Sequence, residues 1–160
     1  YKNFITETGI HAINLFEYLF GPISDIKVFC SHPWDRTIPN KVVELFFESG
    51  LKGVIKFFPF AGISAEWYDI YAKNQLIHMS LAQPFTDTQE SELRIYKNTA
   101  NNCFESEKIL DDPKHSEFKK AGLIDEFEEL IDIISSRKNK SLSNFQNAYH
   151  SMQVCEKIEQ

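Results

Sequence analysis

The sequence has little of what the most easily recognised functional sites require. Its six glycines form no GxGxxG motif, and the chain contains no P-loop, no HExxH and no GxSxG. Because these motifs hold phosphates, bind zinc or present a nucleophile, the chain by itself does not build a dinucleotide site, a zinc-protease site or a serine-hydrolase site. The three cysteines, Cys30, Cys103 and Cys155, form no CxxC pair, which excludes a zinc knuckle and a redox dithiol. We expect all three to be buried and reduced.

The chain also lacks the features of proteins that bind nucleic acids or membranes. The formal net charge is −6 and no basic run is present, which argues against a phosphate-backbone partner. No apolar run approaches the ~20 residues of a membrane span, and no signal peptide opens the sequence. We therefore expect a cytoplasmic protein with neither a nucleic-acid nor a membrane partner.

What is present suits a folded domain with a large aromatic core. The 160 residues are 42% hydrophobic and include 14 phenylalanines, and they show no repeat or linker, so we expect residues 1–160 to form a single domain. The sequence begins at Tyr1 without a methionine, and the stretch with the best candidates for catalytic residues lies within the first two dozen residues. We therefore expect a longer polypeptide whose remaining part lies upstream.

Apolar periodicity predicts a helix, several strands and two further helices. The predicted strands cover residues 23–30, 41–48, 51–58, 66–72, 76–81, 92–97 and 102–108, and the predicted helices cover 6–20, 117–137 and a segment that begins at residue 143. This order of elements, one helix followed by strands and then two helices, predicts an α+β fold with an open, mainly antiparallel sheet. We expect the N-terminal helix and the two C-terminal helices to pack on one face of that sheet.

Two details of the C-terminal helices follow from their patterns. The first has an apolar stripe formed by Leu123, Phe127, Leu130, Ile131 and Ile134, with acidic residues outside it. The second opens with Ser143-Asn144-Phe145-Gln146, which has the form of a capping box. Its predicted buried stripe consists of Phe145, Ala148, Tyr149, Met152 and Cys155.

The first helix carries the best candidate for chemistry. Steps of three and four residues place Glu7, His11, Asn14 and Tyr18 in one stripe, opposite an apolar face formed by Ala12, Ile13, Phe16, Leu19 and Phe20. A carboxylate, an imidazole and an amide in line could transfer protons at neutral pH. The alternative is a solvated polar face that contains one histidine, and Tyr18 fits amphipathic packing better than catalysis.

The other histidines give weaker indications. His78 lies within a strand and is expected to be partly buried, and His32 lies in a loop that we expect at the surface. His115 and His150 have no carboxylate in register, so no role is assigned to them. The acidic residues of the helix at 117–137 spread around its outer arc, so no metal site is predicted.

The opening stretch resembles a known family motif. Glu7-Thr8-Gly9-Ile10-His11-Ala12-Ile13-Asn14, followed by Leu19-Phe20-Gly21, is similar to D-x-G-x-H-x-x-D…L-x-G, which opens the C-terminal domain of the glucose-fructose oxidoreductase/inositol dehydrogenase/MocA (Gfo/Idh/MocA) family. The hairpin around residues 50–53 and the closing helices at 123–134 and 152–158 extend the resemblance over nearly the whole chain. At residues 7 and 14, Glu and Asn stand where the motif has Asp.

The resemblance implies a fold, a reaction and roles for three residues. It implies the C-terminal, dihydrodipicolinate-reductase-like domain of an oxidoreductase whose missing N-terminal Rossmann domain binds NAD or NADP. In that family His11 would exchange a proton with a hydroxyl of a sugar or polyol substrate, Glu7 would assist it, and Asn14 would hold a substrate hydroxyl. The domain would also form a homo-oligomer through its sheet face.

Two alternatives to this interpretation stay open. The fold could be kept as a non-catalytic binding or dimerisation module, which the departures at residues 7 and 14 favour. The redox cycle of the nicotinamide could also serve elimination or glycoside cleavage in place of net oxidation.

Overall fold

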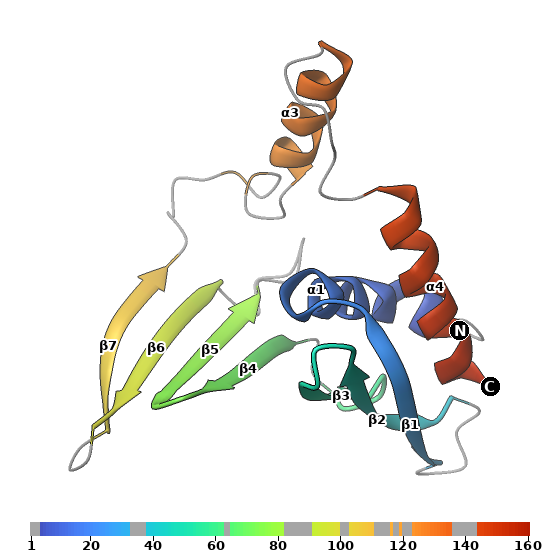
Figure 1. Cartoon of the computed structure of the whole chain (residues 1–160), viewed down its shortest axis with the longest axis horizontal. Coiled ribbons are helices and arrows are strands. Elements are labelled where there is room, and N and C mark those ends of the chain that lie inside the picture. Colours follow the sequence, from blue (N-terminus) through green and yellow to red (C-terminus); the bar gives the residue numbers. More distant parts are fainter. Residues whose placement is uncertain are drawn as a thin grey trace. The chain divides into compact units, whose positions relative to one another are not determined.

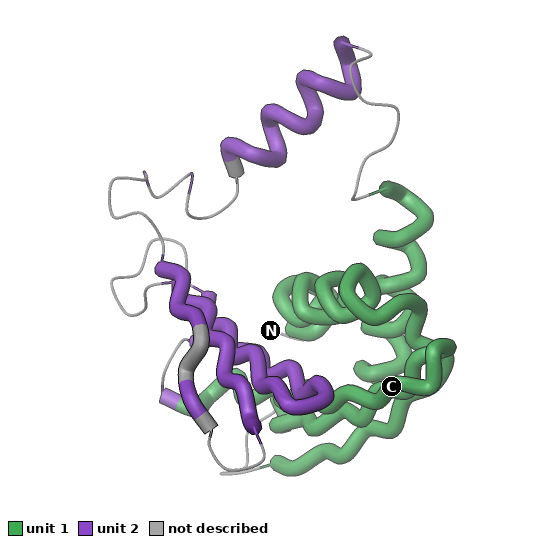
Figure 2. The backbone as a smooth tube through the Cα atoms, turned by 60° about the vertical axis from the view of Figure 1, so that its left-hand side comes forward, with its two compact units in different colours: residues 1–61, 142–160 green, residues 62–141 purple. Residues whose placement is uncertain are grey.

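The computed structural model describes residues 4–32, 38–62, 65–81, 91–99, 103–110, 116, 119, 123–135 and 144–160. The chain divides into two compact units, residues 1–61 with 142–160 and residues 62–141, here called unit 1 and unit 2 (Figure 2). The described strands form one antiparallel sheet of three strands and another of four, where the sequence pattern predicted one. The α+β class with open antiparallel sheets is confirmed, whereas the assignment of residues 1–160 to a single domain stays a prediction.

Unit 1 combines both ends of the chain. Its elements are a π-helical turn η1 (Ile5–Gly9), α1 (Ile10–Phe20), β1 (Ile23–Ser31), β2 (Asn40–Phe47), β3 (Lys52–Phe57) and α4 (Phe145–Glu159) (Figure 1). The strands pair antiparallel in the order β1-β2-β3, and α4 packs against α1, η1 and β1. The predicted hairpin between β2 and β3 is confirmed, and Gly50 in its turn has a φ of 82°, which favours glycine.

The core of unit 1 lies between this sheet and the helices. Val43, Leu45 and Phe47 alternate along β2 and are buried, which confirms the face predicted for them. They pack with the helices in one apolar cluster: Ile5, Ile13, Ile23, Ile55, Phe57, Val154, Cys155 and Ile158. The buried face of the N-terminal helix is thus centred on Ile13.

Of the stripe predicted for α4, only Cys155 lies in the core. The buried residues are Ser151, Val154, Cys155 and Ile158, whereas Phe145 is 84% exposed and Tyr149 and Met152 are also exposed. The prediction failed because it counted large apolar side chains, and the face toward α1 includes a wholly buried serine. The cap was also misplaced by one residue, since Asn144 Oδ1 accepts the hydrogen bond from the Asn147 N–H at 3.0 Å.

Unit 2 contains a four-stranded meander and a helix. The strands β4 (Glu66–Ala72), β5 (Gln75–Leu81), β6 (Glu92–Asn98) and β7 (Cys103–Leu110) pair antiparallel in sequence order, which confirms the predicted strands. The turn between β4 and β5 contains Asn74 with a φ of 59°, a conformation that asparagine tolerates. Helix α3 (Leu123–Ile134) is confirmed, but the described side chains of its apolar stripe are exposed, with Phe127 at 66% and Ile134 at 74%.

Two further expectations have clear outcomes. None of the helices in the described part of the chain is long and apolar enough to cross a membrane. Cys155 is buried as expected, but Cys30, near the end of the edge strand β1, is exposed. Desolvation raises the pKa of the Cys155 thiol to about 12.

Candidate functional site

Two residues of the predicted site, Glu7 and His11, both reach the surface. Glu7 lies in η1 and His11 in the first turn of α1, and both side chains are exposed. Gly9 between them is buried, and a Cβ atom on it would lie 3.0 Å from Cε1 of Phe57 in β3. The glycine therefore lets the helix approach the sheet closely enough to fix the backbone that carries His11.

The start of this helix is held by a residue from the other end of the chain. Glu159 Oε1 accepts hydrogen bonds from the N–H groups of Ile5 at 3.1 Å and Thr6 at 3.3 Å. A carboxylate satisfies the otherwise unpaired amides at a helix start and suits the positive end of the dipole. In the same region Lys41, which is buried, donates a hydrogen bond from Nζ to the carbonyl oxygen of Ile158.

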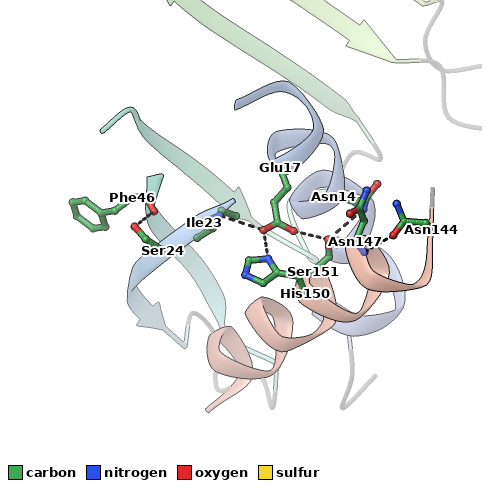
Figure 3. Close-up of polar contacts among 9 residues, drawn as sticks. All are labelled: Asn14, Glu17, Ile23, Ser24, Phe46, Asn144, Asn147, His150 and Ser151. Atoms are coloured by element: carbon green, nitrogen blue, oxygen red, sulfur yellow. Dashed lines mark hydrogen bonds and ion pairs between the residues drawn. The ribbon is translucent and has the colours of Figure 1, made fainter. Parts of the chain in front are cut away.

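The third predicted site residue belongs to the contact between two helices. Asn14 is half-buried, and its Nδ2 donates a hydrogen bond to Oγ of Ser151 in α4 at 3.2 Å (Figure 3). Glu7 and His11 thus share the exposed side of the helix, while Asn14 turns toward α4. Tyr18 is 63% exposed, so the packing expected for it is not found.

Sequence reasoning missed a polar group with several partners in the described part of unit 1. The side chain of Glu17 is only 11% exposed, and Figure 3 shows three groups converging on its carboxylate. Oε1 accepts from the N–H of Ile23 at 3.3 Å and lies 2.5 Å from His150 Nδ1, and Oε2 accepts from Ser151 Oγ at 2.7 Å. His150, to which no role was assigned, therefore has a carboxylate partner that lies 133 residues away in the sequence.

One signal in the sequence could have revealed this network. Glu17 lies four residues after Ile13 and directly follows Phe16, so it borders the apolar face of its helix. A carboxylate there must be paired with donors, because an unpaired buried charge is costly. The donor could not have been identified from the sequence, because spacing within a helix reveals only partners three or four residues away.

The network fastens α1 to α4 and orients one histidine. Ser151 is fully buried and shared between Asn14 and Glu17, so the two helices are joined by a continuous set of hydrogen bonds. The imidazole of His150 is 42% exposed and is held through Nδ1. A fixed carboxylate can set the tautomer of a histidine, but the burial of its partners indicates chiefly a structural link.

The remaining histidines and possible metal ligands add little to the site in unit 1. His32 is exposed next to the end of β1, as expected, and His115 lies outside the described residues. His78 is partly buried in β5, also as expected, and pairs with Asp69 at 2.6 Å. Across the described ranges, no three histidine, cysteine or acidic residues come together as a metal site would require.

No protein-family model matches the sequence, and neither a curated protein nor a solved structure is significantly similar to it. Membership of the Gfo/Idh/MocA family therefore stays a prediction, which depends on the opening motif and on the order of the elements.

Proposed function

We propose that this chain is the substrate-binding and oligomerisation domain of an oxidoreductase. More specifically, it would belong to a cytoplasmic, NAD(P)-dependent enzyme of the Gfo/Idh/MocA type that acts on a sugar, a polyol or a related hydroxylated substrate. The observation that carries the proposal is the exposed His11 on a helix with a fixed backbone. The contact of Gly9 with Phe57 and the Glu159 cap both restrain that helix.

In this proposal His11 relays the proton of the substrate hydroxyl. An imidazole titrates near neutral pH and can therefore accept and return a proton during turnover. Glu7, exposed four residues earlier, would orient the imidazole or stabilise its protonated form. Asn14 already donates from Nδ2 to Ser151, so its contact with a substrate hydroxyl would use the carbonyl oxygen of the amide.

Among the described residues, the helix starts at η1 and α4 do not fit the dinucleotide. A pyrophosphate is usually bound by amides at a helix start, but at η1 the Ile5 and Thr6 amides already bind Glu159. At the start of α4, the Asn144 side chain occupies the Asn147 amide. In this proposal a separate Rossmann domain would hold NAD or NADP, and this chain would supply the proton-transfer group.

A second candidate function is a non-catalytic binding or dimerisation module. The observation that favours it is the engagement of Asn14 with Ser151, because a residue expected to contact substrate takes part in helix packing. Such a module would keep the fold and the oligomer interface without the reaction.

The test compares two histidine variants in the polypeptide that joins this chain to its dinucleotide domain. We expect His11→Ala to lower kcat by about 100-fold or more, the usual contribution of a general acid–base group. His32→Ala, which removes another exposed histidine, should leave kcat unchanged and serves as the matched control.

Three results of this test would revise the proposal. Unchanged turnover in His11→Ala would overturn the role of His11. The absence of any bound dinucleotide would favour the non-catalytic module. If dinucleotide is bound but no net NADH or NADPH accumulates, elimination or glycoside cleavage would replace net oxidation.

A further inference from the structure

We propose that one face of the four-stranded sheet in unit 2 is a binding groove for an uncharged, polyhydroxylated ligand such as an oligosaccharide. All of the residues that form this groove lie in unit 2. The inference therefore does not depend on His11 or on the proposed oxidoreductase reaction.

The sheet register brings charged side chains from all four strands into one row. Asp69 in β4 pairs with His78 in β5, His78 pairs with Arg94 in β6, and Arg94 pairs with Lys108 in β7. Residues directly opposite each other in adjacent strands point to the same face of a sheet. Glu92 lies two residues before Arg94 and therefore shares this face.

Two adjoining hollows lie along this face. One of about 510 Å³ is lined by Asp69, Leu76, His78, Glu92, Arg94 and Tyr96. The other, of about 390 Å³, is lined by Ala72, Asn74, Gln75, Leu76, Tyr96 and Asn98. Because Leu76 and Tyr96 line both, the hollows join into one groove with charged groups at one end and amides at the other.

The charges in the groove already compensate one another. Asp69 Oδ1 lies 2.6 Å from His78 Nδ1, and Glu92 Oε2 accepts from Arg94 Nη2 at 3.0 Å and lies 3.2 Å from Lys108 Nζ. The hydrogen bond from Arg94 lowers the pKa of Glu92 to about 2, so the carboxylate stays ionised at neutral pH. An anionic ligand would have to compete with Glu92, and a cationic ligand with Arg94 and Lys108.

Hydroxyl groups suit such a surface better than charged groups do. A hydroxyl both donates and accepts, so it can donate to a carboxylate oxygen or accept from an ammonium group without breaking the ion pair. The side chains are accessible for this, since Asp69, His78 and Lys108 are between 35% and 39% exposed. The amides of Asn74, in the turn between β4 and β5, and of Asn98 extend the same chemistry to the other end.

Aromatic rings on the same face supply the apolar part of the recognition. Trp67 and Tyr71 lie two residues before and after Asp69 in β4, so all three share the face, and the two aromatic side chains are 57% and 79% exposed. A sugar ring presents C–H groups on its flat faces, which pack well against exposed aromatic rings that also carry a polar group. Rings beside charged and amide side chains therefore match a ligand that is both hydroxylated and partly apolar.

The experiment titrates the intact chain with two neutral trisaccharides, maltotriose and cellotriose, and follows backbone amide resonances by NMR. We expect saturable shifts at residues 69, 78, 94 and 96 with at least one of these sugars. Trp67→Ala and Asp69→Asn should each weaken binding by about tenfold, the effect of losing one contact of this kind. Glu156→Gln, a carboxylate-to-amide change at an exposed position in α4, should leave the dissociation constant unchanged.

Several outcomes would overturn the proposal that this groove binds a polyhydroxylated ligand. If neither trisaccharide shifts these resonances, or if both groove variants bind as tightly as the unchanged chain, the proposal is wrong. If sodium phosphate shifts the same resonances and the sugars do not, the face is an anion site. Shifts that depend only on protein concentration would identify an interface with a second copy. Shifts around His11 without shifts in unit 2 would support the oxidoreductase proposal and reject the groove.

Discussion

At the scale of single residues, Gly9 connects the motif to the fold. Glycine is unfavourable in a helix relative to alanine by about 1 kcal/mol, so a helical glycine needs a packing reason. Here the reason is Phe57, whose ring atoms occupy the place that a side chain at residue 9 would take. The glycine of the motif therefore serves the position of His11 indirectly, through the contact between helix and sheet.

We expect Gly9→Ala to destabilise the chain. The new methyl group would lie 3.0 Å from Cε1 of Phe57, which is itself buried, so the helix or the ring must move. Overpacking of this kind costs about 1–3 kcal/mol and should outweigh the helical preference of alanine. Urea unfolding followed by circular dichroism would measure the difference.

Gly53→Ala is the matched control for this prediction. Its added Cβ would be 3.4 Å from the nearest atom, in Phe47, which is an ordinary contact. This variant should be as stable as the unchanged chain or slightly more stable. A Gly9→Ala protein that resisted urea equally well would show that the helix does not need the close approach.

The candidate site could be predicted only in part at this scale. The exposure of Glu7 and His11 follows from the helical period, because both lie opposite the apolar residues that centre on Ile13. The pairing of Glu17 with His150 could not be foreseen. It depends on which residues of α4 meet α1, and a pattern confined to one helix does not contain that information.

At the scale of secondary-structure elements, α4 stabilises the start of the first helix. The two helices run antiparallel, because Glu159 meets Ile5 while Ser151 meets Asn14. The carboxylate near the end of one helix thus caps the beginning of the other. This arrangement explains how η1 can lack a capping side chain of its own.

We expect Glu159→Ala to loosen this helix start. Losing a side-chain cap costs about 1 kcal/mol, and the freed amides should exchange with solvent faster. Hydrogen exchange measured by NMR should therefore show earlier exchange at Ile5 and Thr6. Glu156→Ala removes an exposed carboxylate one turn earlier in α4 and should leave both amides protected. Equal protection in the two variants would contradict the capping role.

The ion pair between Glu92 and Arg94 in unit 2 predicts how the stability of the chain depends on pH. The hydrogen bond from Arg94 lowers the pKa of Glu92 from 4.5 to about 2 in the folded chain. Above pH 4.5 the carboxylate of Glu92 is mainly ionised in both the folded and the unfolded chain, and its contribution to stability is present. As pH falls from 4.5 toward 2, the unfolded chain binds a proton at this carboxylate while the folded chain still keeps it ionised, so the contribution is lost. We expect Glu92→Gln to flatten the fall in urea stability over this range.

Trp67 lies in β4 and can report this unfolding by its fluorescence once Trp34 is replaced by Phe. Glu107→Gln, an exposed change in β7, serves as the control and should keep the steep dependence. Acid sensitivity that is identical in Glu92→Gln and in the unchanged chain would show that the ion pair does not stabilise the sheet.

Strands were more predictable than helix faces in this chain. The alternation of Val43, Leu45 and Phe47 identifies β2 and its buried side, because the period of a strand is short and its core residues are apolar. In α4 the buried face includes Ser151, which is stabilised by hydrogen bonds to residues of α1, and hydrophobicity alone assigns it to the surface. The division of the strands into two sheets likewise has no signal in the local pattern.

At the scale of the whole molecule, the outer face of the three-stranded sheet suits self-association. The face opposite the core carries exposed apolar side chains, with Phe29 at 56% and Val54 at 53%. On the same face Lys27 and Lys52 both lie over the ring of Phe46, at 5.3 and 5.4 Å from its centroid. Acidic Asp25 and Glu44 share this face, so a second copy related by a two-fold axis can place acidic groups opposite the lysines.

We propose that this face forms the homo-oligomer interface, and we expect Val54→Glu to weaken it. A charge in the middle of an apolar contact should raise the dissociation constant by at least about tenfold, measured by sedimentation velocity at micromolar concentrations. Tyr149→Glu, an equally exposed change on α4, should leave association intact. A strictly monomeric unchanged chain would rule out the interface. If only Tyr149→Glu dissociates the oligomer, the contact involves α4 and the outer face of the sheet remains exposed to solvent.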